Sequence, residues 1–330
     1  LIFDEPTAVL VPQEVDDLFN ALKGLRAEGM AIIFISHKLD EVLRVADDVT
    51  VVRAGSTVAQ VKSKDVTARE LAELMVGSEL PQPTTHGDTR RPEVTLSLKD
   101  VSVPTKSGSR DLISHISFDL QAGEVIGIAG VEGNGQAELV EAIMGLREYT
   151  GQIEFKGKNI DNYSVAHRHD AGIGLIPEDR QRQALMMNSP LWENRILGHQ
   201  RSKPVMRGFI LDKKATIADT RVIMDEFDVR APGPHTLATA LSGGNQQKFI
   251  VGREMSKAPA LLVASHPTRG VDVGAQAAIW DELRSAREKG MAIVLISADL
   301  EELIGMSDRL LVMLRGAITA ELNPQKTTPE

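Results

Sequence analysis

The sequence predicts an α/β fold in which a mainly parallel sheet carries helices on both faces. Three short apolar segments have the length and composition of buried strands, and a segment with helical periodicity follows each one. We expect strands at residues 1–3, 31–35 and 125–129, and helices at residues 13–28, 38–46 and 138–144. Buried strands that alternate with helices are typical of βαβ units, and a glycine-rich loop joins the last of these strands to its helix.

Length and composition restrict the function classes. At 330 residues the chain exceeds what one hydrophobic core usually organises, so we expect one large domain and part of another. The absence of cysteine excludes disulfides and thiolate metal sites. A net charge of −9 argues against direct binding to nucleic acid. The apolar runs are too short to span a bilayer, so we expect no transmembrane segment and a membrane role only through a partner. Because Leu1 lies inside an apolar strand, the chain is expected to be truncated at its N-terminus.

Two carboxylates and a histidine are predicted to meet at one edge of the sheet. Asp4 and Glu5 follow the first strand, and His37 follows the second. Ligands of open α/β sheets bind at the carboxyl ends of the strands, so we expect these side chains to be neighbours near a ligand. Taken alone, these residues favour the alternative of an acidic turn and a helix-capping or core histidine.

The chain between this edge and the glycine-rich loop contains the predicted domain boundary. An apolar stretch at residues 49–61, broken by a glycine, predicts a hairpin, and a short helix is expected at residues 68–75. A polar, proline-bearing linker follows at residues 81–88. Segments 94–103 and 112–120 are expected to pair as strands and to begin a complete domain.

The glycine-rich loop at residues 130–137 reads GVEGNGQA and fits the glycine frame of a phosphate-binding loop. The residues expected to contact a phosphate are Gly130, Gly133, Asn134, Gly135 and Gln136. Gln136 stands where such loops carry a lysine, and Ala137 stands where a serine or threonine binds magnesium. Loss of the lysine contact costs about 1.5–3 kcal/mol, so we expect only weak nucleotide binding.

A second anion cradle is predicted at residues 241–248, which read LSGGNQQK. Two glycines after a serine form a tight turn, and a helix is expected from Gln246 to Met255. The free N–H groups and positive dipole end of that helix attract an anion, and Ser242 adds a hydroxyl donor. The alternative is a helix that Ser242 merely caps.

An internal repeat relates the two ends of the chain, at an offset of 261 residues, as from Thr7 to Thr268. Residues 29–32 match residues 290–293, and Gly55 matches Gly316. In this register Asp4 falls on Ser265, Glu5 on His266 and His37 on Ala298. The second copy therefore keeps the fold signals and loses the charged side chains.

With these motifs in order, the chain resembles the ATP-binding cassette ATPases. Residues 241–244 resemble their signature motif, residues 1–7 their Walker B strand, and Ser36-His37 their switch histidine. The chain more closely resembles the fused tandem ATPases of bacterial simple-sugar and nucleoside importers, through residues 128–136, 176–180, 241–248 and 267–272. Residues 12–16 and 34–42 favour the nucleoside branch.

The resemblance implies the fold and the roles of individual residues. The fold would be that of a P-loop NTPase-like cassette, with an antiparallel β subdomain and a helical subdomain. Glu5 and His37 would be catalytic, and Asp4 would position Mg²⁺ beside ATP. The signature residues that contact the nucleotide of the other cassette would be Ser242, Gly243, Gly244, Asn245 and Gln246.

The resemblance also implies the domain organisation. Residues 1–80 would be the end of a first cassette, residues 81–93 a linker, and residues 94–330 a second, degenerate cassette. The phosphate loop, glutamine loop and signature of the first cassette would precede Leu1. We therefore expect one competent site in the full-length parent and no ATP hydrolysis by the 330-residue chain alone.

The implied partners are transmembrane permease subunits and, indirectly, a solute-binding protein, at the cytoplasmic face of the bacterial inner membrane. Two alternatives share these motifs: a soluble tandem ATPase that acts on ribosomes or nucleic acid, and a non-hydrolysing scaffold that senses nucleotide.

Two smaller features are interpreted as follows. Residues 177–198, with Met186 and Trp192, either dock a coupling helix of the permease or fill the core of the helical subdomain. Residues 167–169, which read HRH, are expected to be a solvated polar run.

Overall fold

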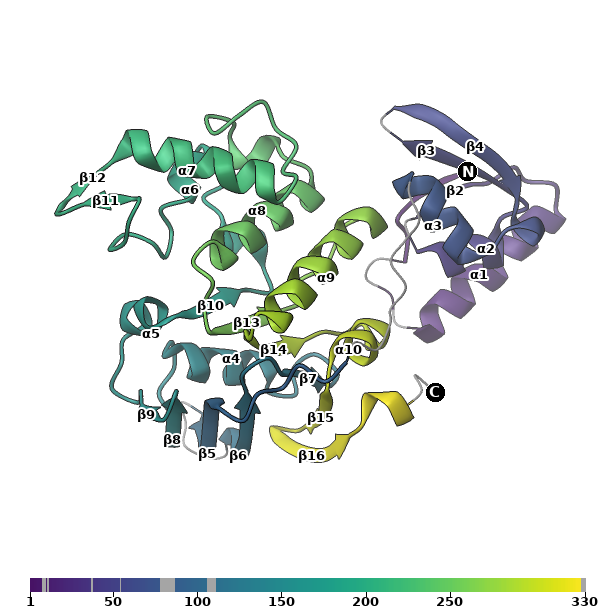
Figure 1. Cartoon of the computed structure of the whole chain (residues 1–330). Coiled ribbons are helices and arrows are strands. Elements are labelled where there is room, and N and C mark those ends of the chain that lie inside the picture. Colours follow the sequence, from purple (N-terminus) through teal and green to yellow (C-terminus); the bar gives the residue numbers. More distant parts are fainter. Residues whose placement is uncertain are drawn as a thin grey trace. The chain divides into compact units, whose positions relative to one another are not determined.

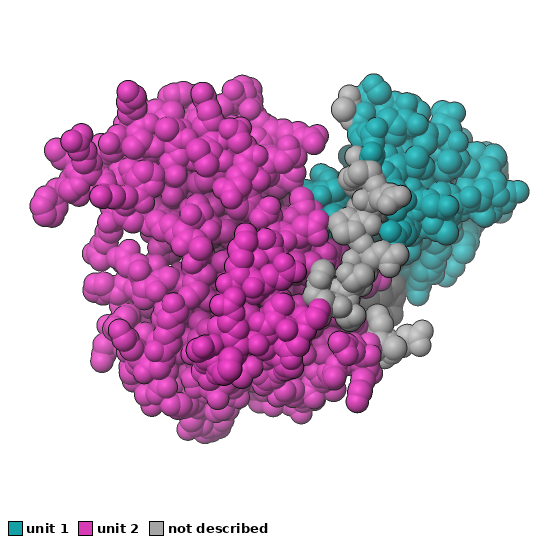
Figure 2. Space-filling model, in the orientation of Figure 1, with its two compact units in different colours: residues 1–82, 272–277 teal, residues 83–271, 278–330 magenta. Residues whose placement is uncertain are grey.

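The computed structural model describes residues 1–7, 10, 12–36, 38–53, 55–77, 87–105 and 111–327. The chain divides into two compact units, which Figure 2 colours separately. Unit 1 contains residues 1–82 and 272–277, and unit 2 contains residues 83–271 and 278–330. Within the described residues, none of the helices combines the length and hydrophobicity needed to cross a membrane.

Unit 1 combines a parallel pair of strands, a hairpin and helices. Its elements are β1 (Ile2–Asp4), α1 (Pro12–Ala27), β2 (Ile33–Ile35), α2 (Leu39–Val45), β3 (Asp48–Arg53), β4 (Ser56–Lys62) and α3 (Ala68–Val76). β1 pairs with β2 in parallel, and β3 pairs with β4 in an antiparallel hairpin, as predicted. The apolar face of α1 buries Phe19 and Leu22. α3 begins with a capping box between Thr67 and Glu70 and ends at Gly77, whose φ of 87° is left-handed.

Unit 2 contains a six-stranded sheet and a separate antiparallel sheet, with the helices α6, α7 and α8 grouped at the end away from β5, β6 and β8 (Figure 1). The strands are β5 (Val94–Pro104), β6 (Asp111–Gln121), β7 (Val125–Ala129), β8 (Thr150–Phe155), β9 (Lys158–Asn159), β10 (Ile173–Ile176), β11 (Met206–Arg207), β12 (Ile210–Leu211), β13 (Leu261–Ser265), β14 (Ala292–Ile296), β15 (Arg309–Leu314) and β16 (Ala317–Leu322). The α-helices are α4 (Gln136–Met144), α5 (Val165–Ala171), α6 (Leu191–Asn194), α7 (Lys213–Glu226), α8 (Gly243–Met255), α9 (Val273–Glu288) and α10 (Leu300–Met306). The first residues of α9, up to residue 277, are assigned to unit 1.

The order of strands in the larger sheet is β10-β13-β14-β7-β15-β16, and only the last pair is antiparallel. The antiparallel sheet has the order β6-β5-β8-β9. One hydrophobic core joins the two sheets through α4, and its fully buried members include Ile116, Ile126, Leu139 and Val294. The predicted α/β class, with its mainly parallel sheet and antiparallel subdomain, is confirmed.

The repeat found in the sequence extends to the backbone. β1 and β2 pair with the same register as β13 and β14, since Phe3 opposes Phe34 and Ala264 opposes Leu295. α1 and α9 have corresponding ends, as do α2 and α10. Even the irregularity of the β3–β4 hairpin, between Val51 and Val52, recurs between Val312 and Met313 of β15. The two halves therefore contain the same local fold over these elements.

One strand of the repeat differs between the units. In unit 2, β7 lies between β14 and β15 and pairs with both. The described residues of unit 1 place no strand between their counterparts, β2 and β3. A cavity of about 810 Å³ lies along these two strands instead, and its lining includes Phe34 and Val51. Ile33 and Ile35 of β2 are 57% and 46% exposed, so this edge of the unit 1 sheet is open.

Two expectations about local structure are wrong. The helix that ends at Met255 begins at Gly243 rather than at Gln246, because Ser242 is its N-cap and both glycines are helical in its first turn. The run at residues 167–169 is not solvated: Arg168 is 1% exposed and the side chain of His169 is 14% exposed. The buried side of α5 brings these two side chains inward, and only His167 stays at the surface.

A buried carboxyl in the second copy should make the stability of unit 2 depend on pH. Glu302 is 1% exposed and accepts hydrogen bonds from Thr268 Oγ1 and Trp280 Nε1, each at 2.8 Å. Burial raises the pKa of Glu302, although its hydrogen bonds oppose this. Because its folded-state pKa is the higher, its contribution to stability is present below the ordinary value of 4.5 and is lost as pH rises through the folded-state pKa.

We therefore expect the free energy of unfolding to fall as pH rises over this range, and Glu302→Gln to remove that part of the fall. Urea unfolding at a series of pH values measures it. Glu288→Gln, at the exposed end of α9, is the matched control. Identical pH profiles for wild type and Glu302→Gln would contradict the assignment.

Candidate functional site

The acidic edge of unit 1 is formed where β1 ends. Asp4 is the last residue of β1, pairs with Ile35 and is exposed. Glu5 has a φ of +48°, and its N–H donates to the carbonyl of Ile35 at 2.9 Å. Thr7 is buried, and its hydroxyl donates to Glu41 Oε2 at 2.5 Å. The strand end thus fixes two consecutive carboxylates beside the end of β2, while His37 lies outside the described residues.

The same edge in unit 2 has the same backbone and different chemistry. His266, the counterpart of Glu5, has a φ of +49°, and its N–H donates to the carbonyl of Ile296 at 2.7 Å. Its Nδ1 accepts the N–H of Ala298 at 3.3 Å, and burial lowers the pKa of the ring. His266 therefore stands in place of the Glu5 carboxylate, and it is hydrogen-bonded to Ala298, the counterpart of His37. This strand end therefore has no carboxylate at the positions of Asp4 and Glu5, and Nδ1 of His266 is already bonded to Ala298.

The phosphate loop of unit 2 is closed by one of its own side chains. Gln136 is 8% exposed; its Oε1 accepts the N–H of Asn134 at 3.1 Å, and its Nε2 donates to the carbonyl of Val131 at 3.1 Å. A loop amide that would otherwise face a phosphate is thereby already bonded. The residues of this loop do not fit a nucleotide phosphate unless the Gln136 side chain leaves.

The loop is also held by hydrogen bonds from the turn between β15 and β16. Asn134 Oδ1 accepts the N–H of Arg315 at 2.7 Å, and the carbonyl of Asn134 accepts the N–H of Gly316 at 2.9 Å. Gly135 has a φ of +110°, and a Cβ there would lie 2.6 Å from Ile113 Cγ2. The close packing and the left-handed backbone therefore require glycine at this position. Gly130 is restricted too, since its Cβ would lie 2.6 Å from Gln136 Nε2, whereas Gly133 has open space.

Restoring the two missing side chains should open this loop to nucleotide. In Gln136→Lys with Ala137→Ser, a charged amine replaces the amide that closes the loop, so we expect affinity for ATP to rise by about 1.5–3 kcal/mol, at least tenfold. Titration of the 330-residue chain with a fluorescent ATP analogue measures the change. Ala137→Ser alone is the control, because it leaves Gln136 in place. Equal affinities of wild type and double variant would show that Gln136 does not limit binding.

The signature segment starts α8. Ser242 Oγ accepts the N–H of Asn245 at 3.4 Å and its Nδ2 at 3.0 Å, which is the geometry of an N-cap. Asn245 Oδ1 in turn accepts the N–H of Arg230 at 2.7 Å. Gln246 is 3% exposed, and its Nε2 donates to the carbonyl of Ala238 at 3.0 Å. The amide side chains of Asn245 and Gln246 thus form hydrogen bonds within unit 2, and Ser242 caps the first turn of the helix.

Arg180 is a residue to which the sequence pattern assigned no role. Its Nη1 donates to the carbonyl of Arg269 at 2.6 Å and its Nη2 to that of Gly270 at 3.2 Å. A Cβ at Gly243 would lie 2.6 Å from Arg180 Nη2, so the guanidinium also touches the start of α8. Burial lowers the pKa of Arg180. The segment 176–180 and the segment 267–272, which are far apart in the sequence, therefore meet at the signature helix.

The site residues thus fall into three groups. Asp4 and Glu5 lie together in unit 1; Gly130, Gly133, Asn134, Gly135 and Gln136 form one closed loop in unit 2; and Ser242, Gly243, Gly244, Asn245 and Gln246 form the first turn of α8 in unit 2.

Trp192 supports the core alternative for the segment 177–198. It is 9% exposed and its ring lies 4.6 Å from Lys213 Nζ, whereas Met186 is 39% exposed.

Comparisons with known proteins agree with this assembly of motifs. A family model described as ABC transporter matches residues 113–269. The nucleoside import ATP-binding protein NupA of Lactococcus lactis and the guanosine import ATP-binding protein NupO of Bacillus subtilis are each 42% identical to this chain over 331 residues. The match covers 100% of this chain and 65% of each relative. The glucose import ATP-binding protein TsgD13 of Haloferax volcanii is 42% identical over 333 residues, which is 60% of its length. The chain thus spans less than two thirds of these relatives.

Solved structures agree on the fold. A nucleotide-free ATP-binding cassette from an ABC transporter superposes with a TM-score of 0.60 at 22% identity, over 70% of this chain and 91% of that one. A dimeric cassette in a post-hydrolysis state, bound to ADP and phosphate, gives a TM-score of 0.61 at 19% identity, over 70% of this chain and 100% of that one. The chain therefore contains a domain of the ABC transporter family, which the family model matches at residues 113–269, and it has the fold of an ATP-binding cassette.

Proposed function

We propose that this chain is part of the ATP-hydrolysing subunit of an importer for nucleosides or simple sugars. The names of relatives such as NupA, NupO and TsgD13, which are import ATP-binding proteins, support this assignment. The observation that carries the proposal is the unequal pair of strand ends: unit 1 keeps Asp4 and Glu5 on the backbone geometry where unit 2 has Ser265 and His266.

The proposed catalytic roles follow from the chemistry of these side chains. Asp4, exposed at the end of β1, would hold Mg²⁺ through water. Glu5 would orient the attacking water and accept its proton, and His37 would contact the γ-phosphate. Bound ATP and Mg²⁺ would supply the reacting phosphoryl group and its charge neutralisation. The first turn of α8, with Ser242, Gly243 and Gly244, would donate hydrogen bonds to the same phosphate.

The phosphate loop for that site would lie outside these 330 residues. The open edge between β2 and β3 supports this, because the corresponding position in unit 2 holds β7, the strand that leads into the phosphate loop. Residues 1–80 would then be the end of a first cassette, residues 81–93 a linker, and residues 94–330 the second cassette.

The second site would be structural or allosteric. Its loop is closed by Gln136, and its strand end carries no carboxylate at the positions of Asp4 and Glu5. We therefore propose one competent composite site in the full-length protein and expect the 330-residue chain alone to lack ATPase activity.

The subunit would work at the cytoplasmic face of the membrane with permease subunits and, through them, a solute-binding protein. Purification of the tagged full-length protein from the membrane fraction, followed by identification of what accompanies it, tests this. A permease whose solute stimulates ATP turnover is the expected result. Co-purification with ribosomes would instead support a soluble tandem ATPase, and nucleotide binding with neither partner nor turnover would support a sensing scaffold.

A further inference from the structure

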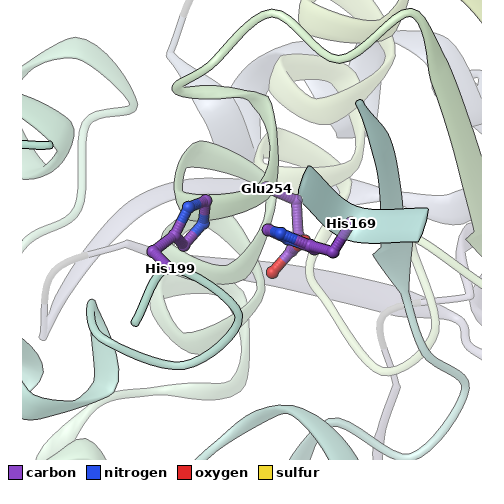
Figure 3. Close-up of side chains that lie close together, drawn as sticks. All are labelled: His169, His199 and Glu254. Carbon is purple, nitrogen blue, oxygen red and sulfur yellow. The ribbon is translucent and has the colours of Figure 1, made fainter. Parts of the chain in front are cut away.

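Two histidines and a glutamate from three separate segments of unit 2 come together in its interior. His169 belongs to α5, His199 follows α6, and Glu254 lies in the last turn of α8. One nitrogen or oxygen atom of each lies within 4.8 Å of the others. Figure 3 shows the two imidazole rings side by side with the Glu254 carboxylate next to them. This group, called the His-His-Glu cluster below, has no part in the nucleotide chemistry proposed above.

The cluster contains polar atoms without partners. His199 is 1% exposed, and neither of its ring nitrogens has a hydrogen-bond partner among the described residues. Nδ1 of His169 is also buried and unpartnered in that part of the chain. Buried polar groups almost always have a partner, and His199 has none for either nitrogen, so one of its ring nitrogens is open to an ion beside His169 and Glu254.

The spacing of the cluster suits a metal ion. Ligand atoms lie about 2.0–2.2 Å from Zn²⁺, so two ligands of a tetrahedral ion are roughly 3.4 Å apart. His169 Nε2 and Glu254 Oε2 are already 3.5 Å apart. The rings of His169 and His199 meet edge to face with centroids 4.8 Å apart, so His199 has to move toward the other two ligands to complete the set.

The backbone at Gly198 allows His169 to lie close to the segment that contains His199. Gly198, with a φ of +77°, precedes His199, and a Cβ there would lie 2.9 Å from His169 Nε2. Any other residue at this position would push His169 away from the cluster.

Three basic side chains lie near the cluster, and each has a partner. Arg253 pairs with Glu254 through Oε1 at 2.9 Å, while Oε2 lies 3.5 Å from His169 Nε2 and also accepts the N–H of Leu175 at 3.5 Å. Arg195 pairs with Asp219 at 2.6 Å, and Lys257 donates to the hydroxyl of Ser202. A carboxylate oxygen has more than one acceptor position, so Glu254 Oε2 keeps one for a metal ion.

We propose that His169, His199 and Glu254 bind a divalent transition-metal ion of the zinc type, with a fourth position for water. Two imidazoles and one carboxylate are a recognised ligand set for Zn²⁺. The ion would tie α5 and the loop after α6 to α8, the helix that begins at the signature residue Ser242. This inference does not depend on the proposed transport function.

Metal binding to the purified protein tests the proposal directly. After treatment with EDTA and its removal, we expect equilibrium dialysis against Zn²⁺ to give one tightly bound ion per chain, and Co²⁺ to give the visible absorption of a tetrahedral site. Zn²⁺ should also raise the unfolding temperature of the protein by mass action.

His169→Ala and Glu254→Gln should each weaken binding at least tenfold and abolish the Co²⁺ absorption. His167→Ala is the matched control, since it removes an exposed histidine from the same helix. His199→Gln, in which the side chain keeps a similar size, should weaken binding in the same way. The proposal is overturned if wild type binds no stoichiometric Zn²⁺, or if His169→Ala and the His167→Ala control bind it equally.

Discussion

Replacing Glu5 with glutamine should lower the rate of ATP turnover by the full-length protein by about 10²–10⁴-fold, the usual contribution of a general base. Glutamine keeps the size of the side chain and its place on the left-handed backbone after β1, but it cannot accept a proton from the attacking water. ATP binding should remain, because Asp4 and the backbone of the strand end are unchanged. Phosphate release at saturating ATP, together with nucleotide binding at equilibrium, measures both parts of this expectation.

The matched control is His266→Gln, which makes the same replacement at the equivalent position of the second copy. We expect its turnover to stay close to that of wild type, because His266 is bonded to the backbone of Ala298 and has no carboxylate to lose. Equal losses in both variants would mean that the two strand ends share the chemistry, and the one-site proposal would be wrong.

Replacing Arg168 should have the largest effect on stability. The guanidinium is 1% exposed and donates five hydrogen bonds, to the carbonyls of Ala142, Ile143, Ile160 and Tyr163 and to the hydroxyl of Tyr149. Two of these acceptors lie in the last turn of α4, and the carbonyl of Ala142 there also accepts the N–H of Gly145. Arg168→Ala removes all five bonds, so we expect a loss on the order of 3–5 kcal/mol in the free energy of unfolding.

Urea unfolding of the purified protein measures this loss. Arg147→Ala, which removes a partly exposed arginine paired with Glu141, is the control and should cost only about 0–1 kcal/mol. If Arg168→Ala unfolds at the same urea concentration as Arg147→Ala, the hydrogen bonds of Arg168 do not stabilise unit 2.

The sequence predicts much of the fold because local patterns determine it. The offset of 261 residues, visible in matches such as Thr7 with Thr268, corresponds to shared strand registers and helix ends in the structure. Short apolar strands and glycine stops are local signals, and each copy of the repeat contains them independently. Burial of Arg168 has no such signal, since two of its acceptors lie in α4, 26 and 25 residues earlier in the chain.

The candidate site is predicted less completely. The sequence identifies Gln136 as a missing lysine, but not that its side chain closes the loop on Asn134 and Val131, because that depends on the conformation of the loop. Similarly, the sequence leaves two alternatives for Ser242, a helix cap and a donor to an anion, and in the structure its hydroxyl caps α8. A capping serine and a nucleotide contact are compatible, since the N–H groups of the first turn remain directed outward from the helix start.

We propose that in the full-length protein Ser242 contacts the nucleotide that is bound beside Glu5. Two substitutions at Ser242 test this contact, because aspartate and asparagine both cap helices about as well as serine, and only aspartate adds a negative charge, which would repel a phosphate. We predict that Ser242→Asp abolishes ATP turnover by the full-length protein, that Ser242→Asn retains most of it, and that Ser242→Asp has no further effect once Glu5→Gln is present. Full turnover in Ser242→Asp would mean that Ser242 does not contact the nucleotide.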